Sequence, residues 1–132
     1  MNQDLALDIL KTGRNVFLTG EPGAGKTHTI NTYVKWLKIH FISVAVTAST
    51  GIAATHIGGR TIHSWAGVGV KDVFSRKDIR KIAKKQYVKK RIKNTQVLII
   101  DEVSMLSQGT LDGVEAVCRE VKGNTKPFGG LQ

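Results

Sequence analysis

The feature that most constrains the fold is a glycine-rich loop at residues 20–27, Gly-Glu-Pro-Gly-Ala-Gly-Lys-Thr. It fits the pattern G-x-x-x-x-G-K-[ST] at every fixed position. An apolar run over 15–19 precedes the loop and predicts a buried strand, and a helical pattern over 26–38 follows it. Glycines let such a loop turn tightly, so that successive backbone N–H groups point at phosphate oxygens. The loop therefore predicts a nucleoside triphosphate site, with an ordinary glycine-rich turn as the alternative.

Each part of this loop has an expected role. Lys26 reaches the terminal phosphates, the Thr27 hydroxyl ligates Mg²⁺, and the following helix adds the partial positive charge of its N-terminus. The residues predicted to contact the nucleotide here are Gly20, Glu21, Pro22, Gly23, Ala24, Gly25, Lys26, Thr27 and His28.

Two acidic residues follow a second apolar strand, predicted at 96–100. Asp101 stands where an aspartate holds Mg²⁺, and Glu102 where a glutamate polarises the attacking water. Adjacent acids after a strand are weakly specific alone, and solvated acids at a strand exit are the alternative. Downstream of a phosphate loop they favour nucleotide hydrolysis, with Lys26, Asp101 and Glu102 as the catalytic residues and Thr27 and Asp101 as the metal ligands.

The composition limits the class of protein. The chain has 132 residues, 41% of them hydrophobic, which is enough for one domain with a core. No apolar run approaches the roughly 20 residues needed to cross a bilayer. The single cysteine, Cys118, excludes an intramolecular disulfide and is interpreted as core packing on a helix predicted at 109–121. We expect an intracellular protein with no membrane partner, cytoplasmic in a prokaryote and nuclear or mitochondrial in a eukaryote.

The net charge of +10 is concentrated in residues 71–93, which hold eleven Lys or Arg and two acids. Such a density usually marks a contact with a polyanion, most often nucleic acid. A solvated helix face is the alternative. A thin apolar stripe along a helix predicted at 76–92 indicates that this segment docks onto the rest of the domain.

The order of the predicted elements indicates the fold class. Strands at 15–19, 42–47 and 96–100 alternate with helices, beginning with a helix at 3–12, and residues 48–70 are expected to be irregular. Alternating strands and helices predict an α/β fold with a parallel sheet covered by helices on both faces, as in a P-loop NTPase.

Further stretches carry a resemblance to a known family. Residues 44–54 resemble a motif Ia strand and loop, and 58–67 resemble the signature G-G-x-T-[IL]-H-S-[FW]-A-G. Residues 101–106 match D-E-[IV]-S-M-L, and 126–132 match the lead into a further motif. Gln3 stands twelve residues before Asn15, at the spacing of an adenine-reading glutamine. Nearly the whole chain thus resembles petite-integration-frequency-type (PIF-type) DNA helicases, which are superfamily-one 5′→3′ translocases related to RecD.

This resemblance implies an ATP-dependent DNA helicase with ATP and Mg²⁺ as cofactors and Gln3 as an adenine contact. Residues 1–132 would be the N-terminal part of a RecA-like motor domain 1A, with 71–93 as a basic, insertion-like segment of domain 1A or of domain 1B. Single-stranded DNA and duplex junctions are the implied partners of a monomer. The implied DNA-binding residues are Thr47, Thr50, Gly51, Thr61, His63, Ser64, Lys84 and Lys85.

Alternatives stay open for several of these residues. Helix capping or turn formation competes with phosphate contacts at the threonines, and a buried, hydrogen-bonded imidazole competes with a DNA contact at His63. Core packing is favoured over base stacking for Trp65.

In the resembling helicases, a strand ending in Gly-Asp-x-x-Gln senses the γ-phosphate and lies between the phosphate-loop strand and the strand before Asp101. We expect the chain to be truncated before that strand, and to lack the second motor domain with its arginine finger, which contributes about 10³–10⁵ in rate. The 132 residues alone are therefore expected neither to unwind DNA nor to hydrolyse ATP appreciably, and to be poorly stable because strand edges stay unpaired. The alternatives are a truncated, non-catalytic nucleic-acid-binding remnant and another P-loop ATPase, such as a helicase loader.

Overall fold

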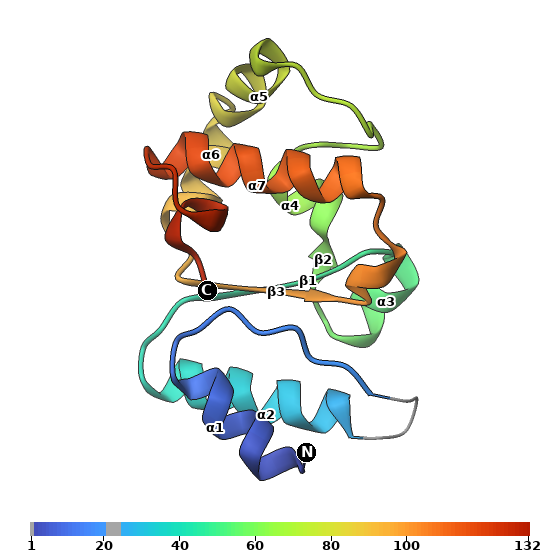
Figure 1. Ribbon diagram of the computed structural model, residues 1–132, viewed down its shortest axis with the longest axis vertical. Coiled ribbons are helices and arrows are strands. Elements are labelled where there is room, and N and C mark those ends of the chain that lie inside the picture. Colours follow the sequence, from blue (N-terminus) through green and yellow to red (C-terminus); the bar gives the residue numbers. More distant parts are fainter. Residues whose placement is uncertain (1, 21–24) are drawn as a thin grey trace.

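The computed structural model describes residues 2–20 and 25–132, and a three-stranded parallel sheet lies at its centre (Figure 1). The strands are β1 (Val44–Ala48), β2 (Arg60–Thr61) and β3 (Val97–Asp101), in the spatial order β2-β1-β3. β1 and β3 pair along their whole length, whereas β2 pairs only with the last two residues of β1. The prediction of an α/β fold with a parallel sheet is confirmed.

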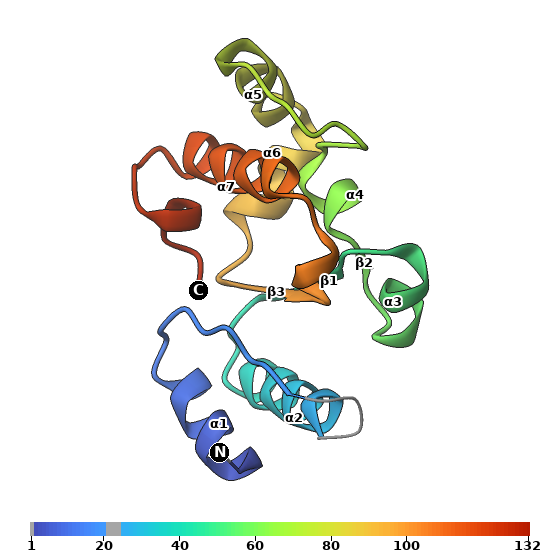
Figure 2. The same ribbon diagram turned by 45° about the vertical axis from the view of Figure 1, so that its right-hand side comes forward.

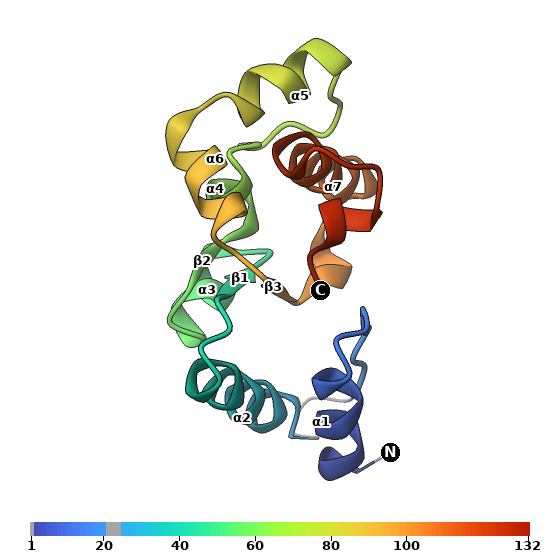
Figure 3. The same cartoon turned by 90° about the vertical axis from the view of Figure 1, so that its left-hand side faces the viewer.

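Helices cover both faces of this sheet, as predicted (Figures 1 and 3). One layer contains α1 (Gln3–Lys11) and α2 (Lys26–Ile39). The other contains α4 (Ile62–Ala66), α5 (Arg76–Ala83), α6 (Gln86–Lys93) and α7 (Gln108–Lys122). The short helix α3 (Gly51–His56) lies beside β2 (Figure 2). The described residues also contain two 3-10 helices, η1 (Val103–Met105) before α7 and η2 (Pro127–Gly130) after it.

Each helical layer packs its own apolar cluster against the sheet. The layer of α7 contributes the larger cluster, which includes Ile62, Trp65, Val88, Ile92, Val114, Val117 and Cys118. The layer of α2 contributes Leu10, Tyr33 and Leu37, which pack with Val97 of β3. Cys118 is fully buried, so its interpretation as core packing is confirmed.

Residues 15–19 are not a strand, which corrects the prediction of a buried one there. Val16 and Phe17 are 39% and 72% exposed. A strand requires a neighbour for its backbone groups, and on this side the described sheet ends at β3. Only Gln132 runs along β3 there: the Leu98 N–H donates to the Gln132 carbonyl (2.8 Å) and the Gln132 N–H to the Gln96 carbonyl (3.3 Å). Among the described residues, the apolar run therefore has no neighbouring strand with which to form backbone hydrogen bonds.

Two other predicted elements were wrong in detail. The stretch 48–70, expected to be irregular, contains α3, β2 and α4. The single basic helix predicted at 76–92 is two helices, because the backbone at Lys85 is extended (φ −62°, ψ 127°). The apolar spacing continues across this break, so periodicity alone did not reveal it.

The Gln132 side chain joins three segments that are distant in sequence. Its Nε2 donates to the carbonyls of Leu10 (2.8 Å) and Arg14 (3.1 Å). The Tyr33 hydroxyl lies 3.0 Å from Gln132 Oε1 and 3.1 Å from the Leu10 carbonyl, and can donate to either. Burial raises the pKa of Tyr33, and the Gln132 hydrogen bond offsets part of that rise. This cluster connects α1 and α2 to the residues beside β3.

Replacing Tyr33 by Phe should lower the free energy of unfolding by about 1 kcal/mol, because buried acceptors lose a donor while the ring still packs. Tyr87→Phe is the matched control, since Tyr87 is 48% exposed. Urea unfolding of both variants measures the difference. Equal stability of the two variants would contradict the role given to the Tyr33 hydroxyl.

The Cys118 thiol should resist alkylation in the folded protein. Burial raises its pKa to about 12, so little reactive thiolate forms at pH 8. Iodoacetamide labelling followed by mass spectrometry should show no modification in buffer and complete modification in urea. Labelling of the folded protein at the rate of a free thiol would show that this helix face is open.

Candidate nucleotide site and nucleic-acid interface

A hollow of about 1290 Å³ lies where the N-terminus of α2 faces the carboxyl end of β3. The predicted site residues that line it are Gly20, Gly25, Lys26, Thr27, Asp101 and Glu102. The loop and the acidic pair, distant in sequence, are thus brought to one cavity. Glu21, Pro22, Gly23 and Ala24 lie outside the described residues.

Gly25 sets the start of α2. Its backbone is left-handed (φ 87°, ψ 14°), a conformation that glycine adopts without steric cost, and the helix begins at Lys26. The first N–H groups of a helix have no acceptor within it and carry the positive end of the helix dipole. Lys26 and Thr27 therefore bring both their side chains and the first backbone N–H groups of α2 to the hollow. His28 is exposed on the same turn but does not line the cavity.

Gln3 lies beside the loop, as its predicted role requires. It is the first residue of α1, and its amide occupies the space that a side chain at position 25 would fill. Glycine at position 25 therefore meets two requirements, the left-handed backbone and the close approach of Gln3.

The two acids leave the end of β3 in different conformations. Asp101 is the last residue of the strand and is partly buried, and its carbonyl accepts the Ser49 N–H (3.1 Å). Glu102 is exposed and left-handed (φ 53°), a conformation that costs a non-glycine residue about 1–3 kcal/mol. Its N–H donates to Asp101 Oδ1 (3.0 Å). The turn after β3 therefore places two adjacent carboxylates, those of Asp101 and Glu102, at the hollow.

The donors around the hollow suit Mg²⁺. Thr27 and Asp101 line the same cavity. Among residues 2–20 and 25–132, no group of three or more His, Cys, Asp or Glu side chains forms a metal cluster. A hydroxyl and a carboxylate, completed by water and phosphate oxygens, are typical of nucleotide-bound Mg²⁺ and not of a site built from protein ligands alone.

The threonines predicted to contact DNA have structural partners in the sheet and the short helices. Thr47 is fully buried, and its hydroxyl donates to the Ile99 carbonyl (2.7 Å). Thr50 caps α3 by accepting the Ala53 N–H, and Thr61 caps α4 by accepting the Ser64 N–H (both 3.2 Å). These contacts match the helix-capping alternative for Thr50 and Thr61.

The other predicted DNA contacts lie nearer the surface. Gly51 and Ser64 are exposed, and His63 is partly buried. Trp65 is 3% exposed within the larger apolar cluster, so core packing is confirmed for it. Lys84 and Lys85 are exposed at the break between α5 and α6.

A hydrogen-bonded cluster around Asp72 was not predicted from the sequence. Its Oδ1 accepts from the hydroxyls of Ser107 (2.9 Å) and Thr110 (3.1 Å), at the start of α7. Ser107 also caps α7 by accepting the Thr110 N–H (3.1 Å). The cap is readable from the sequence, but the link to a residue 35 positions earlier is not. The cluster joins the loop before the basic helices to the segment after Glu102.

The chain resembles known proteins of one family. The model of the PIF1-like helicase family matches residues 3–132. The chain belongs to this family. The ATP-dependent DNA helicase Pif1 of Psychrobacter sp. is 53% identical over 132 residues, which are all of this chain and 20% of that protein.

Solved structures of the family share the fold. The crystal structure of Pif1 helicase from Candida albicans has a TM-score of 0.90 at 38% identity, over 98% of this chain and 30% of that one. Pif1 helicase from Bacteroides in complex with ADP-AlF3 and single-stranded DNA has a TM-score of 0.81 at 29% identity, over 98% of this chain and 30% of that one. The chain thus spans about a fifth to a third of the relatives it matches. None of the helices in the described part of the chain could span a membrane.

Proposed function

We propose that the protein is an ATP-dependent DNA helicase that translocates 5′→3′ along single-stranded DNA, and that this chain supplies the nucleotide site of its first motor domain. The observation that carries the proposal is the meeting of Lys26, Thr27, Asp101 and Glu102 at one hollow. Family membership supports it, as does the Bacteroides relative solved with ADP-AlF3 and single-stranded DNA. Most of the length of such relatives lies outside this chain, so unwinding itself is proposed of the whole protein.

Gln3, beside Gly25, and the residues at the hollow each have a proposed task. Gln3 reads the adenine edge, because an amide offers a donor and an acceptor together. Lys26 and the first N–H groups of α2 hold the phosphates. Thr27 and Asp101 would hold Mg²⁺, which when bound neutralises charge that develops on the transferred phosphoryl group. Glu102 orients the attacking water.

The sheet offers a direct connection between this site and the DNA surface. The Ser49 N–H bonds the Asp101 carbonyl, so the loop carrying Thr50 and Gly51 is joined to the strand that carries the catalytic acids. We assign contacts with the phosphate backbone of single-stranded DNA to Thr50, Gly51, Thr61, His63 and Ser64. Thr47, buried against Ile99, holds the loop in place.

The segment 71–93 would contact phosphates of the single strand beside a duplex junction, with Lys84 and Lys85 exposed between its two helices. It would be an insertion-like part of the motor, acting in a monomer whose second motor domain lies elsewhere in the protein. ATP binding and release would then open and close the cleft between motor domains and step the protein along DNA.

Lys26→Ala should abolish ATP hydrolysis in the full-length protein by removing the phosphate contact. Glu102→Gln should leave ATP binding intact and slow hydrolysis by about 10²–10⁴, the range for loss of a general base. Glu120→Gln makes the same charge change on an exposed position of α7 and serves as the control. DNA-stimulated phosphate release and nucleotide binding measure these effects. An unsubstituted protein that binds nucleic acid without hydrolysing ATP, and whose binding Lys26→Ala leaves intact, would point instead to a non-catalytic nucleic-acid-binding protein.

Replacing Lys84 and Lys85 together by Ala should flatten the salt dependence of single-stranded DNA binding. Each lost phosphate contact lowers the slope of log K against log salt by about 0.7, so the pair should lower it by about 1.4. Lys35→Ala with Lys38→Ala removes the same charge from exposed positions on α2. Fluorescence anisotropy with oligo-dT from 50 to 300 mM salt gives the slopes. Equal slopes in the two double variants would remove these lysines from the interface.

A further inference from the structure

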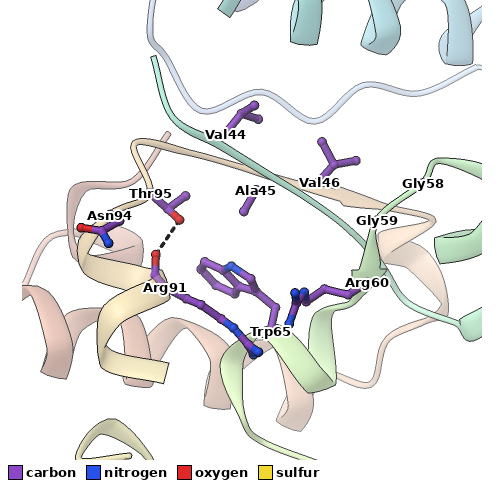
Figure 4. Close-up of a pocket in the computed structure, with 10 residues that line it drawn as sticks. All are labelled: Val44, Ala45, Val46, Gly58, Gly59, Arg60, Trp65, Arg91, Asn94 and Thr95. Carbon is purple, nitrogen blue, oxygen red and sulfur yellow. Dashed lines mark hydrogen bonds between the residues drawn. The ribbon is translucent and has the colours of Figure 1, made fainter. Parts of the chain in front are cut away.

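A second pocket lies at the edge of the sheet, away from the phosphate loop (Figure 4). Its volume is about 540 Å³, and Val44, Ala45 and Val46 of β1 form one wall. The Gly58–Gly59 turn and Arg60 close one end, and Arg91, Asn94 and Thr95 close the other. Figure 4 shows the Arg60 and Arg91 side chains extending toward the Trp65 ring between these ends.

The β1 wall of this pocket is an open strand edge. Ser43 offers its carbonyl to the Val97 N–H (3.1 Å), and the Ser49 N–H donates to the Asp101 carbonyl (3.1 Å). Because alternate residues of a strand face each neighbour, the N–H and C=O of Val44 point away from β3. β2 pairs only with Thr47 and Ala48, so no described strand lies beside Val44. A partner strand could form backbone hydrogen bonds there.

The pocket is positively charged. Arg60 and Arg91 are its only ionisable lining residues, and neither has a salt-bridge partner within the described ranges 2–20 and 25–132. Arg60 is exposed. Arg91 is held in place, because its Nη1 donates to the Ser64 carbonyl (3.0 Å) and its guanidinium lies 4.9 Å from the Tyr87 ring centre. Guanidinium groups prefer carboxylates and phosphates as partners.

We propose that this edge binds an extended acidic peptide segment of a partner protein, which adds as a strand beside Val44. Peptide N–H and C=O groups pair with the backbone of β1, and acidic side chains contact Arg60 and Arg91. The site is separate from the nucleotide hollow and does not depend on the proposed helicase function.

Three observations favour a peptide over a nucleic-acid strand. A phosphodiester backbone has no hydrogen-bond donor for the Val44 carbonyl, whereas a peptide has both groups. Trp65 is 3% exposed, so its ring cannot stack with a base. Arg60 and Thr61 are adjacent in β2 and therefore point to opposite faces, which separates the Arg60 side chain from the DNA contact assigned to Thr61.

The test uses the full-length protein and a fluorescein-labelled peptide of eight alternating Val and Glu residues, in 150 mM salt. Arg60→Glu should weaken binding by about tenfold or more, since it replaces an attraction by a repulsion. Lys77→Glu is the matched control, because it makes the same charge change on the exposed surface of α5 and should leave binding within about twofold.

Two further probes separate strand addition from general attraction to a basic protein. A peptide of the same sequence with alternate amides N-methylated keeps its charge but cannot pair along a strand, and it should bind at least about tenfold more weakly. Oligo-dT should not displace the peptide, and Arg60→Glu should weaken peptide binding far more than it weakens oligo-dT binding. Equal binding of the methylated peptide, equal loss in Lys77→Glu, or displacement by oligo-dT would each overturn the proposal.

Discussion

The parallel pairing of β1 with β3 is the interaction on which the rest of the structure depends. Parallel strands end at the same edge of a sheet, so the residues after Ala48 and after Asp101 emerge together. The Ser49 N–H and the Asp101 carbonyl extend the ladder past the strands. Without this pairing, the carboxylates and the loop assigned to DNA would have no fixed relation to each other or to α2.

Residues 14–20 show what happens where such pairing is missing. Residues 16–18 are apolar, as is typical of a strand, but no described strand pairs with this segment. The Gln132 amide bonds the Arg14 carbonyl while its backbone continues along β3. A segment forms a strand only where a second segment lies alongside and bonds to its backbone. In the described structure, no such segment lies beside residues 15–19.

Glycine and side-chain caps shape the site more than its charges do. Gly25 allows the left-handed turn that starts α2 and leaves room for Gln3. Thr50, Thr61 and Ser107 each begin a helix that borders the sheet edge or the hollow. These small residues help to set where the ionisable groups lie, and the signature of residues 58–67 has a structural explanation in the Thr61 cap of α4. The same tight turn at Gly58 and Gly59 ends β2's contact with β1 and leaves the strand edge open.

The sequence alone determined the phosphate loop, the acidic pair after a buried strand, the α/β class and the family, because each depends on residue types at short, regular spacing. It also identified Cys118 and Trp65 as core residues from their patterns. Only the tertiary structure decided that 15–19 stays unpaired, that the basic segment breaks at Lys85, and that Asp72 bonds Ser107. The open edge at Val44 belongs to this second group. The physical reason is the same in each case. Hydrogen bonds between distant segments depend on which segments lie side by side in the fold, and local sequence periodicity does not contain that information.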